Sequence, residues 1–357
     1  MKPLTMLIAI AALVVCHGAC ASSPEETRGE AGTVSFILEN DLFYGPDRHY
    51  TQGLQANYMF GDKSSRCLLR SITNSIRLSR EGEAVRCGFG IGQSIFTPRD
   101  LSASEPLPDQ RPYAGWLYLN LMYVRERPGR LDTAQLNIGV VGPSAFGEFV
   151  QNEWHDFVLN IEEAQGWDNQ LRDEPGIALI LERRWRCREQ PGRRCLISQV
   201  FGEGVGDYFA IEPHLGLSLG NVHTHGAAGV TARLGFNLRN DYGAPRIRPA
   251  LAGTAHFRRG RESIIDLPLL GGVNFYAFAG IEGRAVARNI FLDGNTWRDS
   301  LSVEKRNVVG DLQAGGVIQI GRFQLGYTHV IRTKEFMGQE ERDRFGAVML
   351  QFKGGRF

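Results

Sequence analysis

The sequence predicts an all-β fold, namely a transmembrane antiparallel β-barrel of about twelve strands with one short helix in an extracellular loop. Three observations lead to this prediction: an export leader, a recurrent alternation of apolar and polar residues, and no later apolar run of eighteen residues. A helix needs about that many apolar residues to cross a bilayer. Strands are therefore expected to do the crossing.

The leader has the features of a secretory signal peptide. Lys2 supplies positive charge, residues 4–15 are apolar apart from one threonine, and Ala19-Cys20-Ala21 fits a small-x-small cleavage site. The apolar run is too short to span a bilayer as a helix. We therefore expect residues 1–21 to be a signal peptide and residues 22–357 to be one barrel domain.

Charge and cysteine content narrow the class of protein. Without Lys2 the 40 basic residues fall to 39, which equals the 39 acidic residues. A neutral balance predicts no nucleic-acid partner. Four cysteines remain after the leader, and an even number in an oxidising compartment suggests two disulfides. Pairing of Cys67 with Cys87 and of Cys187 with Cys195 is the simplest of three connectivities.

Alternation with a period of two is the main evidence for strands. For example, Val34, Phe36 and Leu38 alternate with Ser35 and Glu39. Twelve segments show such a pattern, and an even number lets a meander close without exposed edges. They are approximately 33–40, 50–60, 87–96, 115–125, 134–142, 176–187, 207–220, 226–237, 273–288, 310–320, 323–332 and 344–352. Residues 246–257 are a possible further strand.

A water-soluble β-sandwich is the alternative fold. It would bury the same apolar faces against each other. The opposite faces of the segments carry Gln, Asn, Thr and Tyr more often than Lys and Glu. That composition is more typical of a polar lumen than of a solvent-exposed face, so the barrel is favoured.

The meander brings three polar connections to one rim. Strands that alternate in direction place the connections after the first, third and fifth strands at the same end. These connections include residues 39–51, 93–116 and 142–168. They contain the most unusual polar clusters of the chain, so a functional site is expected there.

The third connection predicts a helix that starts near Ser144, a residue that can cap it. Gln151, His155 and Glu162 share one face of this helix at helical spacing. A single histidine on a polar face is usually solvated surface. Its amide and carboxylate neighbours favour His155 as a base that takes a proton from water, because such groups orient an imidazole.

The first connection is rich in oxygen donors. Asn40, Asp41, Asp47 and Thr51 carry amide, carboxylate and hydroxyl oxygens, which suit Ca²⁺. Strand phase places Asp41 and Thr51 towards the lumen. An ordinary polar hairpin loop is the alternative, and composition alone favours that alternative.

Six strings occur in order along the whole chain: ENDLFYGPDRHYTQG, QSIFTPRD, RPYAGWLY, GVVGPSAFGEFVQNEWHD, GWDNQL and TKEFMGQ. Together they resemble the lipid A 3′-O-deacylase family of outer-membrane barrels. The resemblance implies a twelve-stranded barrel in the bacterial outer membrane. It also implies hydrolysis of an ester-linked acyl chain of lipid A, the lipid part of lipopolysaccharide, with Ca²⁺ as cofactor. We expect a monomer.

The family motifs imply roles for individual residues. The Val-Gln-Asn-x-x-His motif corresponds to residues 150–155, which makes His155 the general base and Gln151 its neighbour on the helix. The Asn-Asp pair at the end of the first strand implies that Asn40 and Asp41 place the metal. The Tyr-Thr-x-Gly motif makes Thr51 a further catalytic residue.

Two features of the sequence depart from the family pattern. The family's loop lysine has no clear counterpart, so Arg48, Arg99, Arg111 or Lys334 is expected to meet the substrate phosphates. The strings RPYAGWLY and GWDNQL are more typical of a wider branch of the family. Two other functions therefore stay open, namely a calcium-dependent phospholipase and a non-enzymatic structural or pore barrel.

Overall fold

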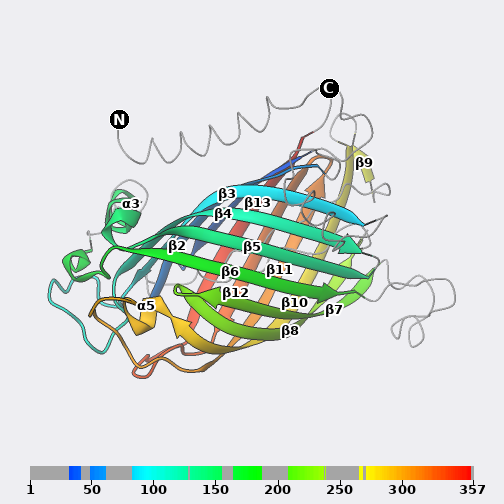
Figure 1. Cartoon of the computed structure of the whole chain (residues 1–357). Coiled ribbons are helices and arrows are strands. Elements are labelled where there is room, and N and C mark those ends of the chain that lie inside the picture. The colour runs from blue at the N-terminus through cyan, green and yellow to red at the C-terminus, as the bar shows by residue number, and fades with distance from the viewer. Residues whose placement is uncertain are drawn as a thin grey trace.

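The structure is a computed structural model. It describes residues 32–41, 49–61, 83–127, 129–154, 164–186, 208–236, 238, 265–267 and 271–354. The described residues form a closed antiparallel β-barrel, as the sequence predicts (Figure 1).

Twelve strands make the barrel wall, which confirms the predicted number. Their bounds are β1 Thr33–Asn40, β2 His49–Met59, β3 Ala84–Thr97, β4 Ala114–Arg127, β5 Arg130–Val141, β6 Glu174–Trp185, β7 Phe209–Gly220, β8 His223–Gly235, β10 Gly271–Asn289, β11 Val308–Ile320, β12 Phe323–Arg332 and β13 Asp343–Lys353. A short segment, β9 (Ile265–Leu267), pairs with the first residues of β10. The possible strand at residues 246–257 lies outside the described residues.

The barrel closes between its first and last strands. Each strand pairs with its neighbours in the chain, and β13 pairs antiparallel with β1 from Thr33↔Lys353 to Asn40↔Gly346. The start of β1 and the end of β13 therefore lie at the same end of the barrel. The short connections from β4 to β5 and from β11 to β12 lie at that end too. We call the other end the rim.

The two faces of the wall differ as a membrane barrel requires. On β4, Leu119 is 63 % exposed whereas Asn120 is fully buried, and Asn120 pairs across the strands with the buried Asn137. Apolar residues thus face outwards and polar residues face the lumen, which is the reverse of a sandwich. The sandwich alternative is wrong.

Aromatic side chains gather on the outer face at the end opposite the rim. The ring pairs, with centroid distances, are Tyr58–Phe60 at 5.1 Å, Phe236–Phe275 at 5.2 Å and Phe323–Phe352 at 5.0 Å. Aromatic girdles of this kind mark the level of the lipid headgroups. This girdle indicates that the barrel axis crosses the membrane, with the end opposite the rim at one headgroup layer.

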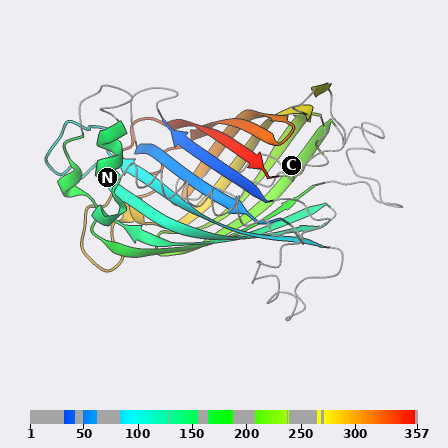
Figure 2. The ribbon, with the colours of Figure 1, turned by 90° about the horizontal axis from the view of Figure 1, so that it is seen from above.

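The helices lie at the rim, at the left in Figure 1 and again in the view from above in Figure 2. Their bounds are η1 Pro143–Ala145, α3 Gly147–Trp154, η3 Trp167–Asn169 and α5 Ile290–Asp293. Ser144 does not cap α3 as predicted, because its hydroxyl donates to Asp173 Oδ2 at 2.8 Å and α3 begins at Gly147. Within the described residues, no helix is long and apolar enough to cross a membrane.

The lumen just inside the rim is packed with aromatic side chains. Phe291 of α5 stacks on Phe96 of β3 with ring centroids 3.9 Å apart, and Trp116 stacks on Tyr118 at 4.2 Å. Val330 and other residues complete this fully buried cluster. The rim is thereby joined across the lumen by side-chain packing rather than left as an open mouth.

Cys87 on β3 forms a disulfide bond. Cys67, Cys187 and Cys195 lie outside the described residues. The two predicted pairings therefore stay predictions.

Candidate active site at the rim of the barrel

Helix α3 packs on the outer face of the wall, over β3. A buried cluster joins the helix to the strand and to the loops beside it; its members are Ile95, Tyr113, Val150, Ala164 and Trp167. The side-chain amide of Gln93, also on β3, donates to the carbonyl oxygen of Ala145 at 2.6 Å. The chain between β5 and α3 is thus fixed to the outside of the barrel.

The chain on both sides of His155 is held in place. Before it, Gln151 is 1 % exposed and its Oε1 accepts a hydrogen bond of 2.9 Å from the indole nitrogen of Trp167. After it, the backbone N–H of Ala164 donates to Asn152 Oδ1 at 3.3 Å. These two contacts hold Ala164 and Trp167, which follow the loop, against α3. His155, one residue beyond α3, and Glu162 lie outside the described residues.

Asn40 lies on the outer face of β1, on the side of the wall that α3 covers. It pairs with Gln52, which in turn pairs with Ile95 of the cluster beneath α3. Cross-strand partners share a face, so the three side chains lie on the same side of the sheet. Asp41 follows directly, and both Asn40 and Asp41 are only 5 % exposed.

Thr51 departs from the predicted strand phase. The pairing of β2 with β3 shifts between Tyr50 and Gln52, so Thr51 occupies a bulge. Its hydroxyl lies 2.7 Å from the hydroxyl of Thr97, which shares the outer face of β3 with Ile95. The prediction that Thr51 faces the lumen is therefore wrong, and the bulge turns it towards the side of α3.

Glu39 and Tyr50 face the lumen behind this part of the wall. The Tyr50 hydroxyl donates to the Glu39 carboxylate, and both groups are buried. They line a small internal pocket together with Gln55, Ser94 and Tyr118. The wall thus separates a polar lumen pocket from the outer group of Asn40, Thr51 and Gln52.

The residues at the end of β1 fit a calcium ion in their chemistry. Asp41 offers a carboxylate and Asn40 an amide oxygen, and both side chains are withdrawn from solvent. Hard oxygen donors of these types are those that Ca²⁺ prefers. Among the described residues, no group of three or more His, Cys, Asp or Glu side chains has metal-binding geometry. A site built on Asn40 and Asp41 would therefore need amide, hydroxyl or backbone oxygens to complete it.

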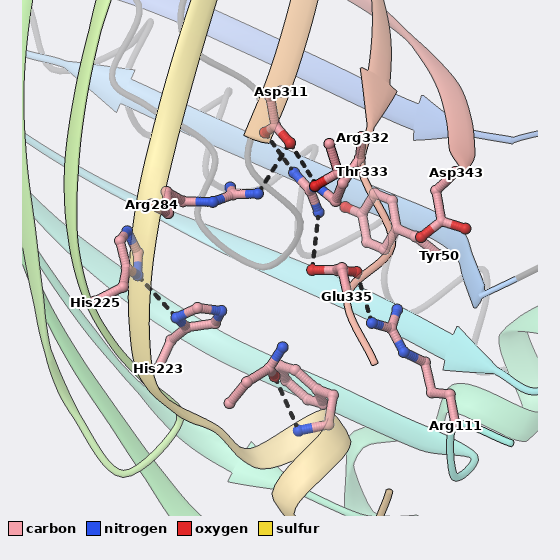
Figure 3. A network of polar contacts seen from close by, with 12 residues as sticks. Tyr50, Arg111, His223, His225, Arg284, Asp311, Arg332, Thr333, Glu335 and Asp343 are labelled. Carbon is pink, nitrogen blue, oxygen red and sulfur yellow. Dashed lines mark hydrogen bonds and ion pairs between the residues drawn. The ribbon is translucent and has the colours of Figure 1, made fainter. Parts of the chain in front are cut away.

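A network of buried ions crosses the lumen inside the rim (Figure 3). Arg332 Nε donates to Asp311 Oδ1 at 2.8 Å, and Arg284 donates to the same oxygen at 3.0 Å. Glu335, in the connection after β12, lies 2.7 Å from an Arg111 nitrogen and 3.6 Å from an Arg332 nitrogen. Burial alone would raise the pKa of Glu335, but the positive charges of Arg111 and Arg332 outweigh it and lower the pKa well below its ordinary value.

The predicted phosphate-binding arginines lie in different surroundings. Arg99 is partly exposed and forms an ion pair with Glu340. Arg111 is 1 % exposed and lies over the ring of Phe96 at 5.3 Å. This arrangement supports a structural role for Arg111, because its guanidinium is committed to buried partners. Arg48 lies outside the described residues.

Trp167, Thr97 and Glu335 belong to the site's framework, although no role is predicted for them from the sequence. Trp167 stands in the string GWDNQL, so its place in a family motif was the available signal. Glu335 is separated from Arg111 by 224 positions. No local pattern could have joined those two residues.

A family model described as outer membrane protein LpxR matches residues 6–353 of the chain. The chain belongs to the LpxR family. Its location is accordingly the outer membrane, in agreement with the barrel fold.

One solved structure agrees with this assignment at the level of the fold. LpxR from Salmonella typhimurium is 19 % identical with a TM-score of 0.65, and the match covers 90 % of this chain and 100 % of that one. The β domain of the Bordetella autotransporter BrkA is 11 % identical with a TM-score of 0.45, covering 91 % and 98 %. No curated protein matches the chain.

Proposed function

We propose that this member of the LpxR family is a Ca²⁺-dependent carboxylic ester hydrolase that removes the 3′-O-linked acyloxyacyl group of lipid A in the outer leaflet. Membership of the family supports the coarser statement that it is an outer-membrane lipid A deacylase. The finer statement is supported by the site. One observation carries it: the helix that precedes His155 is held on the lipid-facing side of the wall, where Asn40 and Thr51 also lie.

This location suits a substrate that stays in the membrane. The acyl chains of a lipid lie against the apolar outer face of a barrel, and its headgroup lies at the level of the rim. An ester bond near the headgroup would then meet residues on the outer face without leaving the leaflet. A lumen-facing site would require the lipid to be extracted first.

His155 is the proposed general base. Its imidazole takes a proton from a water molecule, and the water oxygen attacks the ester carbonyl carbon. The bond from that carbon to the 3′-oxygen then breaks, and the proton is returned to this oxygen as it leaves as a hydroxyl. The products are a free fatty acid and a deacylated lipid A.

The other proposed residues hold the reacting groups in place. Gln151 fixes the helix that carries His155, through its hydrogen bond with Trp167. Thr51 adds a hydroxyl beside Asn40 on the outer face. Asn40 and Asp41 would hold Ca²⁺, which when bound polarises the ester carbonyl as a Lewis acid. Arg48 and Arg99 would contact the phosphates of the substrate.

A pore is not favoured by the described part of the barrel. Phe96, Phe291 and Trp116 fill the lumen inside the rim, and the ion network around Arg332 adds to this packing. An aqueous channel needs an open lumen with polar walls. Because side chains fill the lumen inside the rim, the proposed reaction is assigned to the outer face.

The mass of lipid A tests the proposal directly. Lipid A is extracted from cells that lack the chain, from cells that express it, and from cells that express His155→Gln. We expect a loss equal to one acyloxyacyl group with the wild type only. An unchanged lipid A mass with a folded wild-type barrel and added Ca²⁺ would overturn the proposal, and a change confined to glycerophospholipids would instead indicate a phospholipase.

A further inference from the structure

A cluster of arginines lies on the outer face of the wall, at the end opposite the rim. Arg125, Asp132 and Arg183 stand directly side by side on β4, β5 and β6, because Arg125 pairs with Asp132 and Asp132 with Arg183. Arg130 lies two residues before Asp132 on the same face and is the first residue of β5. We call Arg125, Arg130, Asp132 and Arg183 the basic cluster.

The outward direction of this cluster follows from strand alternation. Arg183 lies two residues after Leu181, which is exposed, and Arg125 lies four residues after Leu121, which is 52 % exposed. Residues an even number apart on a strand share a face. The basic cluster therefore lies on the face that carries the apolar band, not in the lumen.

One carboxylate holds three guanidinium groups together. Asp132 Oδ2 accepts from Arg130 Nη2 at 2.6 Å and from Arg125 Nη2 at 3.0 Å. Its Oδ1 accepts from Arg183 Nε at 2.6 Å. Three positive charges against one negative charge leave an excess of two within the cluster, and the neighbouring Arg127–Glu83 ion pair adds no net charge. Such an excess on a lipid-facing surface favours an anionic partner.

Hydrogen-bond donors remain for such a partner. A guanidinium group has five N–H donors, and within the described part of the chain Arg183 donates only its Nε–H, to Asp132. The side chain of Arg183 is 43 % exposed and that of Arg130 is 26 % exposed. Their remaining N–H groups are suited to bidentate contact with phosphate oxygens.

The apolar band begins immediately beside the basic cluster. Leu181 and Leu121 belong to the next rows of the same face, about 7 Å apart for each two residues along a strand. A phosphate held by Arg130 and Arg183 would therefore have its acyl chains over exposed leucines. This order of charge and apolar surface matches a glycerophospholipid in the leaflet opposite the rim.

We propose that the basic cluster is a binding site for the phosphate headgroup of an anionic glycerophospholipid in the leaflet opposite the candidate active site. The proposal is independent of the deacylase activity, since it concerns the other end of the barrel. The lipid bound there is a ligand and not a substrate, so no bond is made or broken.

Native mass spectrometry of the purified full-length barrel tests the site. Phosphatidylglycerol or the zwitterionic phosphatidylcholine is added to the protein in detergent, and the bound lipid is counted. We expect the wild type to retain phosphatidylglycerol in preference to phosphatidylcholine. Arg130→Gln/Arg183→Gln should retain about tenfold less phosphatidylglycerol, because charge-assisted hydrogen bonds are lost.

Arg322→Gln is the matched control. Arg322 lies in the turn between β11 and β12 at the same end of the barrel but outside the basic cluster. Equal loss of lipid in this control would show non-specific attraction to the headgroup layer and overturn the proposal. So would wild-type binding by the folded double variant, or equal retention of phosphatidylglycerol and phosphatidylcholine by the wild type. If the double variant does not fold, Arg183→Gln alone replaces it, since its side chain is the most exposed of the cluster.

Discussion

The carboxylate of Glu335 accepts a hydrogen bond of 2.7 Å from the guanidinium of Arg111, and both side chains are almost completely buried. The contact joins the connection after β3 to the connection after β12, so it links two sides of the rim. Arg332 lies 3.6 Å from the same carboxylate and extends the link to Asp311. A buried charge that loses its partner is costly, which makes this pair a test of how the rim is held together.

Glu335→Gln should destabilise the barrel by about 3 kcal/mol, because the guanidinium of Arg111 stays buried with its countercharge removed. Glu340→Gln is the control, since the Arg99–Glu340 pair is exposed and should contribute less than about 1 kcal/mol. Unfolding in urea measures both. Equal midpoints for the two variants would show that the buried pair does not stabilise the rim.

The pH dependence of this contribution follows from the pKa of Glu335, which Arg111 and Arg332 lower to about 2 against the effect of burial. A carboxyl group with a lowered folded-state pKa stabilises the fold above its unfolded pKa and loses that effect as pH falls through the folded pKa. The stability difference between wild type and Glu335→Gln should thus be fully present at about pH 6 and shrink below about pH 4. A difference that stays the same from about pH 6 to about pH 3 would contradict this assignment.

His155→Ala should lower the rate of ester cleavage by about 10²–10⁴-fold, the range for loss of a general base. The barrel should keep its heat stability, because the helix before His155 is anchored by Gln151 and Trp167. Release of fatty acid from purified lipid A measures the rate. Cleavage at the wild-type rate would remove His155 from the mechanism.

Asp41→Ala should shift the Ca²⁺ concentration that gives half-maximal activity upwards, because one carboxylate ligand is lost. Excess Ca²⁺ should restore part of the activity if the other oxygens still hold the ion. Addition of a chelator to the wild type should abolish cleavage and leave the barrel folded. Activity that persists in the chelator, measured as fatty-acid release, would exclude Ca²⁺ from the reaction.

Thr51→Val and Thr97→Val separate a catalytic hydroxyl from a structural one. Each variant removes one side of the 2.7 Å contact and should cost about 1–2 kcal/mol of stability. Only Thr51→Val is expected to lower activity strongly, and Thr51→Ser should retain it. If both valine variants lose the same activity, the role of Thr51 is confined to its bond with Thr97.

Trp167→Phe should lower activity without unfolding the barrel. The change keeps most of the apolar packing against Tyr113, whose ring centroid lies 4.9 Å away, but removes the donor to Gln151. A buried acceptor left without its donor costs about 1–3 kcal/mol. The helix before His155 should become less well positioned, which would appear as a lower kcat with a smaller change in KM. An unchanged kcat would separate this contact from catalysis.

Alternation was sufficient to predict which residues face the lipid and which face the lumen. Leu119 and Asn120 illustrate this, since neighbouring residues on a strand must point to opposite faces. The same rule failed at Thr51, because one extra residue in β2 shifts the pairing with β3 and no local signal marks the bulge. Alternation therefore predicts which face a residue lies on only within a stretch of strand that contains no bulge.

The long-range contacts could not be predicted from the sequence. Gln151 lies on the predicted helix, but its partner Trp167 lies on the far side of the loop. Arg111 was expected to contact phosphate because the chain has no clear counterpart of the family's loop lysine and Arg111 is one of the basic residues near the rim. Its burial against Glu335 depends on how two distant connections fold over the mouth of the barrel.

The register between β1 and β13 determines when, during synthesis and insertion, the proposed active site can form. Asn40 pairs with Gly346, so the strand that carries the proposed metal ligands is aligned by a strand made more than three hundred residues later. Until β13 is synthesised and added, β1 has a neighbour on one edge only. The hydrolase proposed here would thus remain inactive through synthesis and transport, and would first be assembled where the barrel closes.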